Sequence, residues 1–398
     1  MTNSARKPHH NRQSARKSLG IAQLALATAI AGLAAFSVQA QSQNYSSVVH
    51  DFELTTVAEG LEIPWSMTWL PNGDMLVTER PGRLRIVRNG TLLAAPVEGV
   101  PEVHAVGQGG LFDVLPHPEF ESNKLVYLSF AKPLPDESTT TVIRGTFEND
   151  RLSNVETIFQ ADTMGRNGHY GGRIAFDDEG YLFITIGDRQ APPSGDLMAH
   201  PSQDLANHNG TVIRLNDDGS VPSDNPFVGQ RGALPEIYSY GHRNPQGMDI
   251  HPITGDLWTD EHGPQGGDEL NIVEAGNNYG WPVIGYGVNY GPGLPIHGSQ
   301  QGEGMEQPRH FWVPSIATAG MMIYGGDLFP NWKGDVFVGR RRGAQLARVD
   351  LADDGKMAVM EETLLNGIGR IRDIHEGPDG AIYIATENRG VLRLSPSE

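Results

Sequence analysis

The sequence predicts an all-β protein, a six-bladed β-propeller whose blades are four-stranded antiparallel sheets. The first observation is a unit that occurs six times: a turn containing Gly, Asn or Asp, followed by a run rich in β-branched and aromatic residues. The second is that little of the chain beyond its N-terminal segment has a helical period. A pair of β-sandwiches would also give many short strands, but the repeated unit favours the propeller.

The turn-strand units follow one another along the chain with uneven spacing. They cover residues 71–87, 121–130, 177–188, 253–263, 332–350 and 378–394. The spacing stretches between the third and the fifth unit. Because insertions in a repeat fold lie in loops, we expect the long central segment at one rim of the propeller, over the channel.

The N-terminal segment has the parts of a secretory signal. Five basic residues precede an apolar run over residues 19–36, and Val38-Gln39-Ala40 precedes a polar stretch. We expect cleavage after Ala40, with a retained membrane anchor as the alternative. Residues 1–40 are therefore predicted to be a signal peptide, 41–50 a flexible lead, and 51–398 a single catalytic propeller domain.

Charge and cysteine content exclude several classes of function. The formal net charge is −18, and loss of the five basic residues of the signal would make it −23. So acidic a protein is a poor candidate for binding nucleic acid or anionic lipid. The sequence has no cysteine, which excludes disulfides and thiolate chemistry. It has no HExxH, GxSxG, Walker or dinucleotide-binding motif, which disfavours serine hydrolysis and nicotinamide chemistry.

Residues 235–282 hold a dense set of candidate functional side chains among glycines and prolines. They are Arg243, Asn244, His262, Asp268 and Glu269. Tight turns of this composition can direct main-chain carbonyls and amides toward a ligand. Such segments are commonly plain surface loops. A connection this long, with its own predicted strands at 248–250 and 256–259, is more often functional.

Polar clusters lie at matching places relative to the repeats, just before or between the predicted strands. They are Gln108, His169, Arg243 with Asn244, and Arg370 with Arg372. In a propeller these positions would converge on one face around the axis. His169 is the candidate base, because an imidazole has the unperturbed pKa nearest neutrality and this one stands on a glycine-bounded turn. A single histidine is nevertheless more often structural.

Positive charge is concentrated at two places in this acidic chain. Arg370 and Arg372 alternate on an extended segment and so point the same way. The two arginines could be solvated or paired with surface acids. Alternatively, they could bind an anion that carries several carboxylates. The run 340–342 is a second arginine cluster. We therefore expect an anionic ligand.

Oxygen ligands for a hard metal ion follow His262. The main-chain carbonyls of Gly263 and Pro264 are of the kind that Ca²⁺ accepts. Asp268 and Glu269 could be ligands, orienting groups or turn acids, and the sequence does not separate these roles.

With these clusters the chain resembles the soluble aldose sugar dehydrogenases of the glucose/sorbosone dehydrogenase family, which use pyrroloquinoline quinone (PQQ). The most specific motifs are GHRNPQG, EHGPQGGDELN followed by NNYGWP, and GRIRD. The resemblance implies a six-bladed propeller, a periplasmic location, one PQQ per subunit and Ca²⁺. It also implies oxidation of aldose sugars at C1 to aldonolactones by hydride transfer to the quinone. Electrons would pass to an external acceptor, a quinone or a cytochrome, and the chain would be a monomer or a weak homodimer.

The resemblance further implies a role for each matching residue. His169 would remove the proton of the sugar C1 hydroxyl, while Gln108 and Arg243 would flank the quinone carbonyls, all three in contact with the cofactor. The other implied ligands are Asn244, Arg370 and Arg372 for PQQ, Gly263 and Pro264 for the catalytic Ca²⁺, and Glu269 and Tyr279 for a further Ca²⁺.

Two positions depart from the family pattern. Where the family usually has a lysine against the cofactor, this chain has three arginines, of which Arg342 is expected to replace it, with Arg341 as the alternative. Gly168 stands where strongly glucose-active members carry an aspartate, so a broad range of aldoses is expected. The rival functions are a Ca²⁺-dependent lactonase and a non-catalytic carbohydrate-binding propeller.

Overall fold

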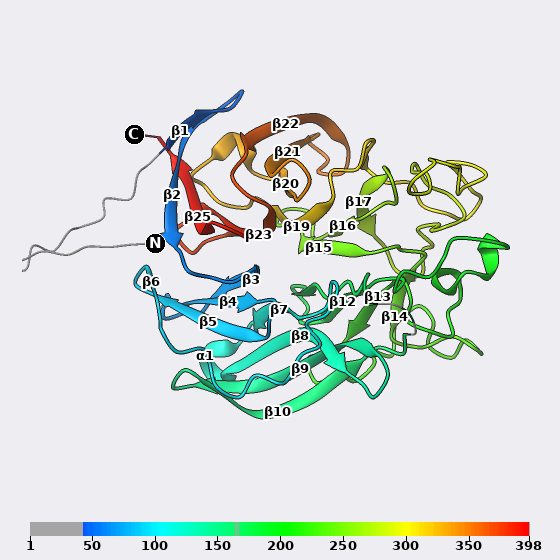
Figure 1. The fold of residues 1–398 in the computed structure, drawn as a ribbon, viewed down its shortest axis with the longest axis horizontal. Coiled ribbons are helices and arrows are strands. Elements are labelled where there is room, and N and C mark those ends of the chain that lie inside the picture. Colours follow the sequence, from blue (N-terminus) through cyan, green and yellow to red (C-terminus); the bar gives the residue numbers. More distant parts are fainter. Residues whose placement is uncertain (1–42, 164, 166, 398) are drawn as a thin grey trace, which may run out of the picture. The chain divides into compact units, whose positions relative to one another are not determined.

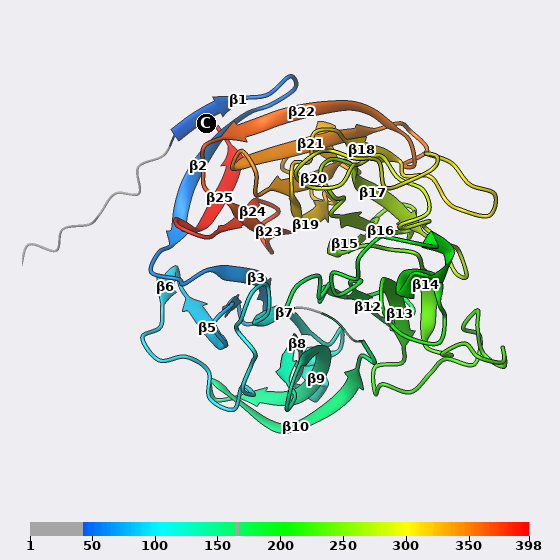
Figure 2. The same cartoon turned by 45° about the vertical axis from the view of Figure 1, so that its right-hand side comes forward.

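The computed structural model describes residues 43–163, 165 and 167–397, so the predicted signal peptide lies outside the described residues. The described chain is built almost entirely of β-strands in six antiparallel sheets (Figure 1). The sheets are the blades of a six-bladed β-propeller (Figure 2), which confirms the predicted fold class. No helix among these residues is long and apolar enough to cross a membrane.

Five blades consist of four consecutive strands each. They are β3 (Pro64–Trp69), β4 (Met75–Glu79), β5 (Arg83–Arg88) and β6 (Thr91–Leu92); β7 (Leu111–Pro116), β8 (Leu125–Pro133), β9 (Ser138–Glu148) and β10 (Arg151–Gln160); β11 (Ile174–Phe176), β12 (Leu182–Ile186), β13 (Thr211–Leu215) and β14 (Ile237–Tyr240); β15 (Pro245–Ile250), β16 (Leu257–Glu261), β17 (Asp268–Val273) and β18 (His310–Trp312); and β19 (Thr318–Ile323), β20 (Val336–Arg340), β21 (Gln345–Leu351) and β22 (Ala358–Asn366). The helical elements are α1 (Phe120–Asn123) and 3-10 turns at Leu197–Ala199, Pro201–Gln203 and Pro330–Trp332. The first strands of neighbouring blades contact one another around the axis.

The sixth blade joins the two ends of the described chain. Its strands β23 (Ile371–Glu376), β24 (Ile382–Thr386) and β25 (Gly390–Pro396) are followed by β2 (Asp51–Ala58), which pairs antiparallel with β25. Figure 1 shows this pair as a blue strand beside a red one. Part of the predicted flexible lead forms a further strand, β1 (Gln43–Ser46), which pairs with β2.

The repeated turn-strand unit of the sequence corresponds to the inner hairpin of each blade. Its turn joins the first strand to the second, as residues 251–256 join β15 to β16. The second strands β4, β12, β16, β20 and β24 are buried at every position. Both faces of such a strand pack against neighbouring blades, which is why each of these strands begins with an apolar run in the sequence.

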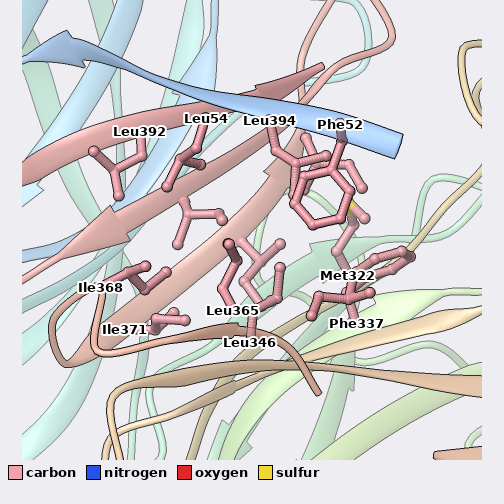
Figure 3. Packing of buried hydrophobic residues seen from close by; sticks show 14 of the residues in the cluster. Phe52, Leu54, Met322, Phe337, Leu346, Leu365, Ile368, Ile371, Leu392 and Leu394 are labelled. Atoms are coloured by element: carbon pink, nitrogen blue, oxygen red, sulfur yellow. The ribbon is translucent and has the colours of Figure 1, made fainter. Parts of the chain in front are cut away.

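Apolar packing also holds the closing strand in place. Figure 3 shows Phe52 and Leu54 of β2 with Leu394 of β25 in a buried cluster that includes Phe337 and Leu346 of the preceding blade. The ring is therefore closed by hydrogen bonds within the sixth blade and by a hydrophobic core between the fifth and the sixth.

Phe52→Ala should destabilise the whole propeller. The side chain is 0% exposed, and truncating a buried Phe costs about 3–5 kcal/mol of unfolding free energy. Val48→Ala is the matched control, because Val48 is 69% exposed and a surface change stays within ~0.5 kcal/mol. Equilibrium unfolding in urea measures both. Equal stability of the two variants would show that β2 does not close the ring.

Candidate active site

A polar cavity of about 350 Å³ lies where the first strands of several blades begin. The predicted residues that line it come directly before a first strand or at its start. They are Gln108 before β7, His169 before β11, Arg243 and Asn244 before β15, and Arg370 and Arg372 at β23. The structure thus brings together six residues that lie far apart in the sequence.

Further cavity residues follow the end of a second strand. They are Arg80 after β4, His262 after β16, Arg341 after β20 and Glu387 after β24. The sequence had named His262 as a candidate and Arg341 as an alternative, whereas Arg80 and Glu387 were not predicted. In an antiparallel hairpin the start of the first strand and the end of the second lie at the same edge. The position directly after the second strand of each repeat could therefore have identified these residues in the sequence.

The side chain of His169 is buried and held by a carboxylate that the sequence analysis missed. Its Nδ1 lies 2.6 Å from Oδ1 of Asp188, two residues beyond β12. Burial opposes the charge on Asp188, but the interactions with His169 and Arg243 and a hydrogen bond from the amide of Gln190 together outweigh it and lower the pKa of this carboxyl. Asp188 is therefore ionised and accepts the Nδ1 proton, which makes Nε2 the basic nitrogen of His169.

The imidazole is neutral at neutral pH. Burial lowers the pKa of His169 below its ordinary value, and Arg243 adds to this, while Asp188 opposes it. A neutral imidazole with its Nδ1 proton fixed can accept a proton at Nε2.

The backbone around His169 is fixed by two of the predicted residues. Its amide donates to Oε1 of Gln108 at 2.9 Å, and the amide of Gly171 donates to Oδ1 of Asn244 at 3.2 Å. His169 has a φ of 49°, an uncommon left-handed conformation for a side-chain-bearing residue. Gln108 and Asn244 thus keep the base in a loop conformation that the chain alone disfavours.

Gly168 makes room for a neighbouring side chain. A Cβ at this position would lie 2.5 Å from the amide group of Gln190. The space that an aspartate side chain would take at residue 168 is thus occupied by Gln190.

Five guanidinium groups and one carboxylate line the cavity, so its walls are strongly positive. The arginines are Arg80, Arg243, Arg341, Arg370 and Arg372. Glu387 lies 2.6 Å from Nε of Arg372, 3.5 Å from Nη2 of Arg341 and 3.6 Å from Nη1 of Arg370. Burial, together with the charge of Arg341, lowers the pKa of Arg372 to about 9.

Buried guanidinium nitrogens still lack acceptors. Among the described residues, Nε of Arg80, Arg243 and Arg341 have no hydrogen-bond partner. A cavity with unpaired donors and excess positive charge fits an anion that carries several carboxylates.

Arg341, rather than the predicted Arg342, faces this cavity. Arg342 is exposed and does not line it. Arg341 is the first residue after β20, the place that Arg80 takes after β4, whereas Arg340 turns away to pair with Glu361. Of the two alternatives named from the sequence, this placement favours Arg341.

The four predicted metal ligands lie together around a small adjoining cavity of about 20 Å³. They are Gly263, Pro264, Glu269 and Tyr279. Glu269 stands opposite Glu261 across β16 and β17, and burial together with the charge of Glu261 raises the pKa of Glu269 well above its ordinary value. The donor set, the buried Glu261 and the half-buried Glu269 beside main-chain oxygens, fits a hard cation.

Two observations limit how such a cation could be held. The carbonyl of Gly263 accepts a hydrogen bond of 2.7 Å from Nη1 of Arg243. In the described part of the chain no group of at least three His, Asp or Glu residues could hold a metal by itself. A cation would therefore depend on main-chain oxygens.

Asp268 has a different role. This buried carboxylate accepts hydrogen bonds from the amides of Gly263, Ile316 and Ala317 and from the hydroxyl of Ser315. Asp268 therefore orients the loop that carries Gly263, which is the second of the three roles that the sequence left open: ligand, orienting group or turn acid.

The fold and this site define a β-propeller with a positively charged cavity, and the family match makes it an oxidoreductase, a dehydrogenase. In particular, the chain belongs to the Glucose / Sorbosone dehydrogenase family, whose sequence pattern matches residues 61–393. The resemblance found from the motifs is confirmed.

Individual relatives match along most of the chain. Aldose sugar dehydrogenase YliI of Escherichia coli is 40% identical over 345 residues, which are 84% of this chain and 91% of that protein. The crystal structure of the soluble aldose sugar dehydrogenase from Escherichia coli in its apo form has a TM-score of 0.80 at 38% identity, covering 87% of this chain and all of that one. The PQQ-bound form of aldose sugar dehydrogenase from Streptomyces coelicolor has a TM-score of 0.70 at 28% identity, covering 86% and 96%.

Asp188→Asn should lower the pKa of His169 further. The carboxylate charge is what raises this pKa against burial, so its removal leaves the imidazolium less stabilised. Heteronuclear NMR titration of the imidazole measures the shift. Glu236→Gln is the control, since Glu236 lies 3.0 Å from Nε2 of another buried histidine, His208, and should leave His169 unchanged. An unshifted His169 in Asp188→Asn would refute the pairing.

Proposed function

We propose that this protein oxidises aldose sugars at C1 to aldonolactones with PQQ as its cofactor. The observation that carries the proposal is a buried His–Asp pair on the wall of a cavity lined by five arginines. The names of its relatives, an aldose sugar dehydrogenase and a PQQ-bound form of one, support the same chemistry.

The cavity fits this cofactor by its charge. PQQ carries three carboxylates, and the cavity offers guanidinium donors, several with unpaired buried nitrogens. Arg341, Arg370 and Arg372 would bind carboxylates, since a guanidinium fork matches a carboxylate plane. Asn244 and Gln108 line the same space. When bound, PQQ would supply the acceptor for the hydride that leaves the sugar C1.

The residues of the chain would handle the proton and the charge. His169 accepts the proton of the C1 hydroxyl at Nε2, because Asp188 holds the other ring nitrogen protonated. Asp188 then stabilises the imidazolium that forms. Arg243 stabilises the negative charge that develops on the cofactor side of the cavity. Because His169 acts in its neutral form and its pKa is lowered, turnover is lost only as the pH falls below the ordinary imidazole range.

A Ca²⁺ ion is proposed at the adjoining site. Gly263 and Pro264 would offer carbonyl oxygens, and Glu269 with the main chain at Tyr279 would hold a further cation. Arg243, which contacts Gly263 in this structure, would then have to share that oxygen.

Substrate range and cellular setting follow as further proposals. With Gln190 in the space beside Gly168, no carboxylate at position 168 selects glucose, which favours a broad range of aldoses. The signal segment favours export to the periplasm. Electrons would leave to an external quinone or cytochrome, and the chain would act as a monomer or a weak homodimer.

The lactonase alternative is less well supported. Its chemistry would place a metal among several carboxylate or imidazole side chains, and the described residues form no such group. It would also give no role to the guanidinium groups of the larger cavity.

Purified protein should reduce an artificial electron dye with aldoses only after PQQ and Ca²⁺ are added. His169→Ala should lower turnover by about 10²–10⁴-fold, the contribution of a positioned general base, while PQQ still binds. Dye reduction assays and PQQ titration measure the two properties. Unchanged turnover in His169→Ala would exclude it as the base.

Arg341→Gln should weaken PQQ binding by about 10- to 100-fold, because one charge-assisted hydrogen bond is lost. Arg342→Gln is the matched control: the same change at the next residue, on an exposed side chain, should leave the affinity within about twofold. Isothermal titration calorimetry with PQQ measures both. A larger effect at Arg342 would restore the original expectation from the sequence.

A further inference from the structure

Trp281 contacts both Asp188, which holds the candidate base, and Arg243, which lines the cofactor cavity. It belongs to the NNYGWP motif, in the connection between β17 and β18, and is 7% exposed. Its Nε1 donates a hydrogen bond of 2.8 Å to Oδ2 of Asp188, the carboxylate that holds His169. The guanidinium carbon of Arg243 lies 5.2 Å from the centre of its ring.

Both the backbone and the ring of Trp281 are held by neighbouring groups. The main-chain amide of Trp281 donates to the carbonyl of Gly241, and its main-chain carbonyl accepts from Nε2 of Gln203 at 2.8 Å. His200 and His297 pack edge-on against the ring, with centroids at 6.2 and 5.6 Å. Burial lowers the pKa of both histidines, so they enclose the ring without adding charge.

Each oxygen of Asp188 has its own partners. Oδ1 faces Nδ1 of His169 and accepts from the amide of Gln190, whereas Oδ2 accepts from Trp281. A carboxylate held at both oxygens cannot rotate, so the imidazole plane is fixed as well. The ring under Arg243 adds a cation–π contact to a guanidinium that also donates to Gly263.

We propose that Trp281 is a positioning residue that fixes the carboxylate behind the base and the guanidinium beside the cofactor in one shared geometry. Neither contact reaches the reacting atoms. The indole acts through Asp188 on His169, and through its ring face on Arg243. The NNYGWP motif thereby places a residue of the fourth blade behind the base of the third.

Two variants separate the two contacts. Trp281→Phe removes the N–H donor and keeps an aromatic face for Arg243. Asp188 then becomes a stronger acceptor for the Nδ1 proton, so the pKa of His169 should rise, opposite to the fall expected in Asp188→Asn. The charged groups that face His169, namely Arg243, Arg189 and Asp188, are unchanged in this variant. Trp281→Leu removes the ring as well and should also weaken PQQ binding.

Trp312→Phe is the matched control. Trp312 is 5% exposed, and its Nε1 donates to Oε2 of Glu361 at 2.8 Å, away from the cavity. Both Phe variants lose one hydrogen bond from a buried indole to a carboxylate, so thermal denaturation should show a loss of stability in each. Only Trp281→Phe should shift the imidazole titration of His169 in NMR spectra.

Turnover gives the second readout, which rests on the proposed function. A misplaced catalytic group costs up to about 10²-fold, so kcat should fall in Trp281→Phe with little change in KM, and stay unchanged in Trp312→Phe. Identical His169 titrations in the two Phe variants would overturn the proposal. A shifted titration in a protein that oxidises no aldose would keep the positioning role and refute the proposed function instead.

Discussion

The antiparallel pairing of the first and second strands is the constraint on which this site depends. Because the two strands run in opposite directions, every blade brings the start of one and the end of the other to the same edge. His169 and Asp188 meet in this way across β11 and β12, 2.6 Å apart although nineteen residues separate them. Closure of the ring by β2 and β25 keeps all such edges around one axis. The active-site geometry is therefore a consequence of hairpin geometry, repeated around the ring.

Charge is sorted between this edge and the interior of the ring. At the start of β23, where its pairing with β24 is irregular, Arg372 faces the cavity while Asp373 pairs with the buried Arg173 at 2.9 Å. The interior pair is neutralised within the protein. At the edge, the single carboxylate of Glu387 faces three arginines. The remaining positive charge would be neutralised by an anionic ligand. The chain as a whole is strongly acidic, so this concentration of positive charge is local and built by the fold.

The sequence was informative wherever a periodic pattern was present. The six turn-strand units predicted the propeller because buried second strands give continuous apolar runs. His169, Gln108 and Arg243 were found because they precede such runs within distinctive motifs. Asp188, Arg80 and Glu387 were missed, since each is an ordinary charged residue just after a strand and only the hairpin reveals which edge it reaches. The sequence could not decide between Arg341 and Arg342 for the same reason: three adjacent arginines differ only in the direction that the strand end gives them.

The geometry of the candidate base His169 depends on the residues that hold its loop and its ring. The imidazole alone is a weak argument for function, because buried histidines are common. Here its backbone is in a left-handed conformation held by Gln108, and its ring is fixed by Asp188. Such strain persists only where surrounding contacts outweigh it. With Asn244, which accepts from the amide of Gly171 in the same loop, those contacts come from three blades, which ties the orientation of one side chain to the closure of the whole ring.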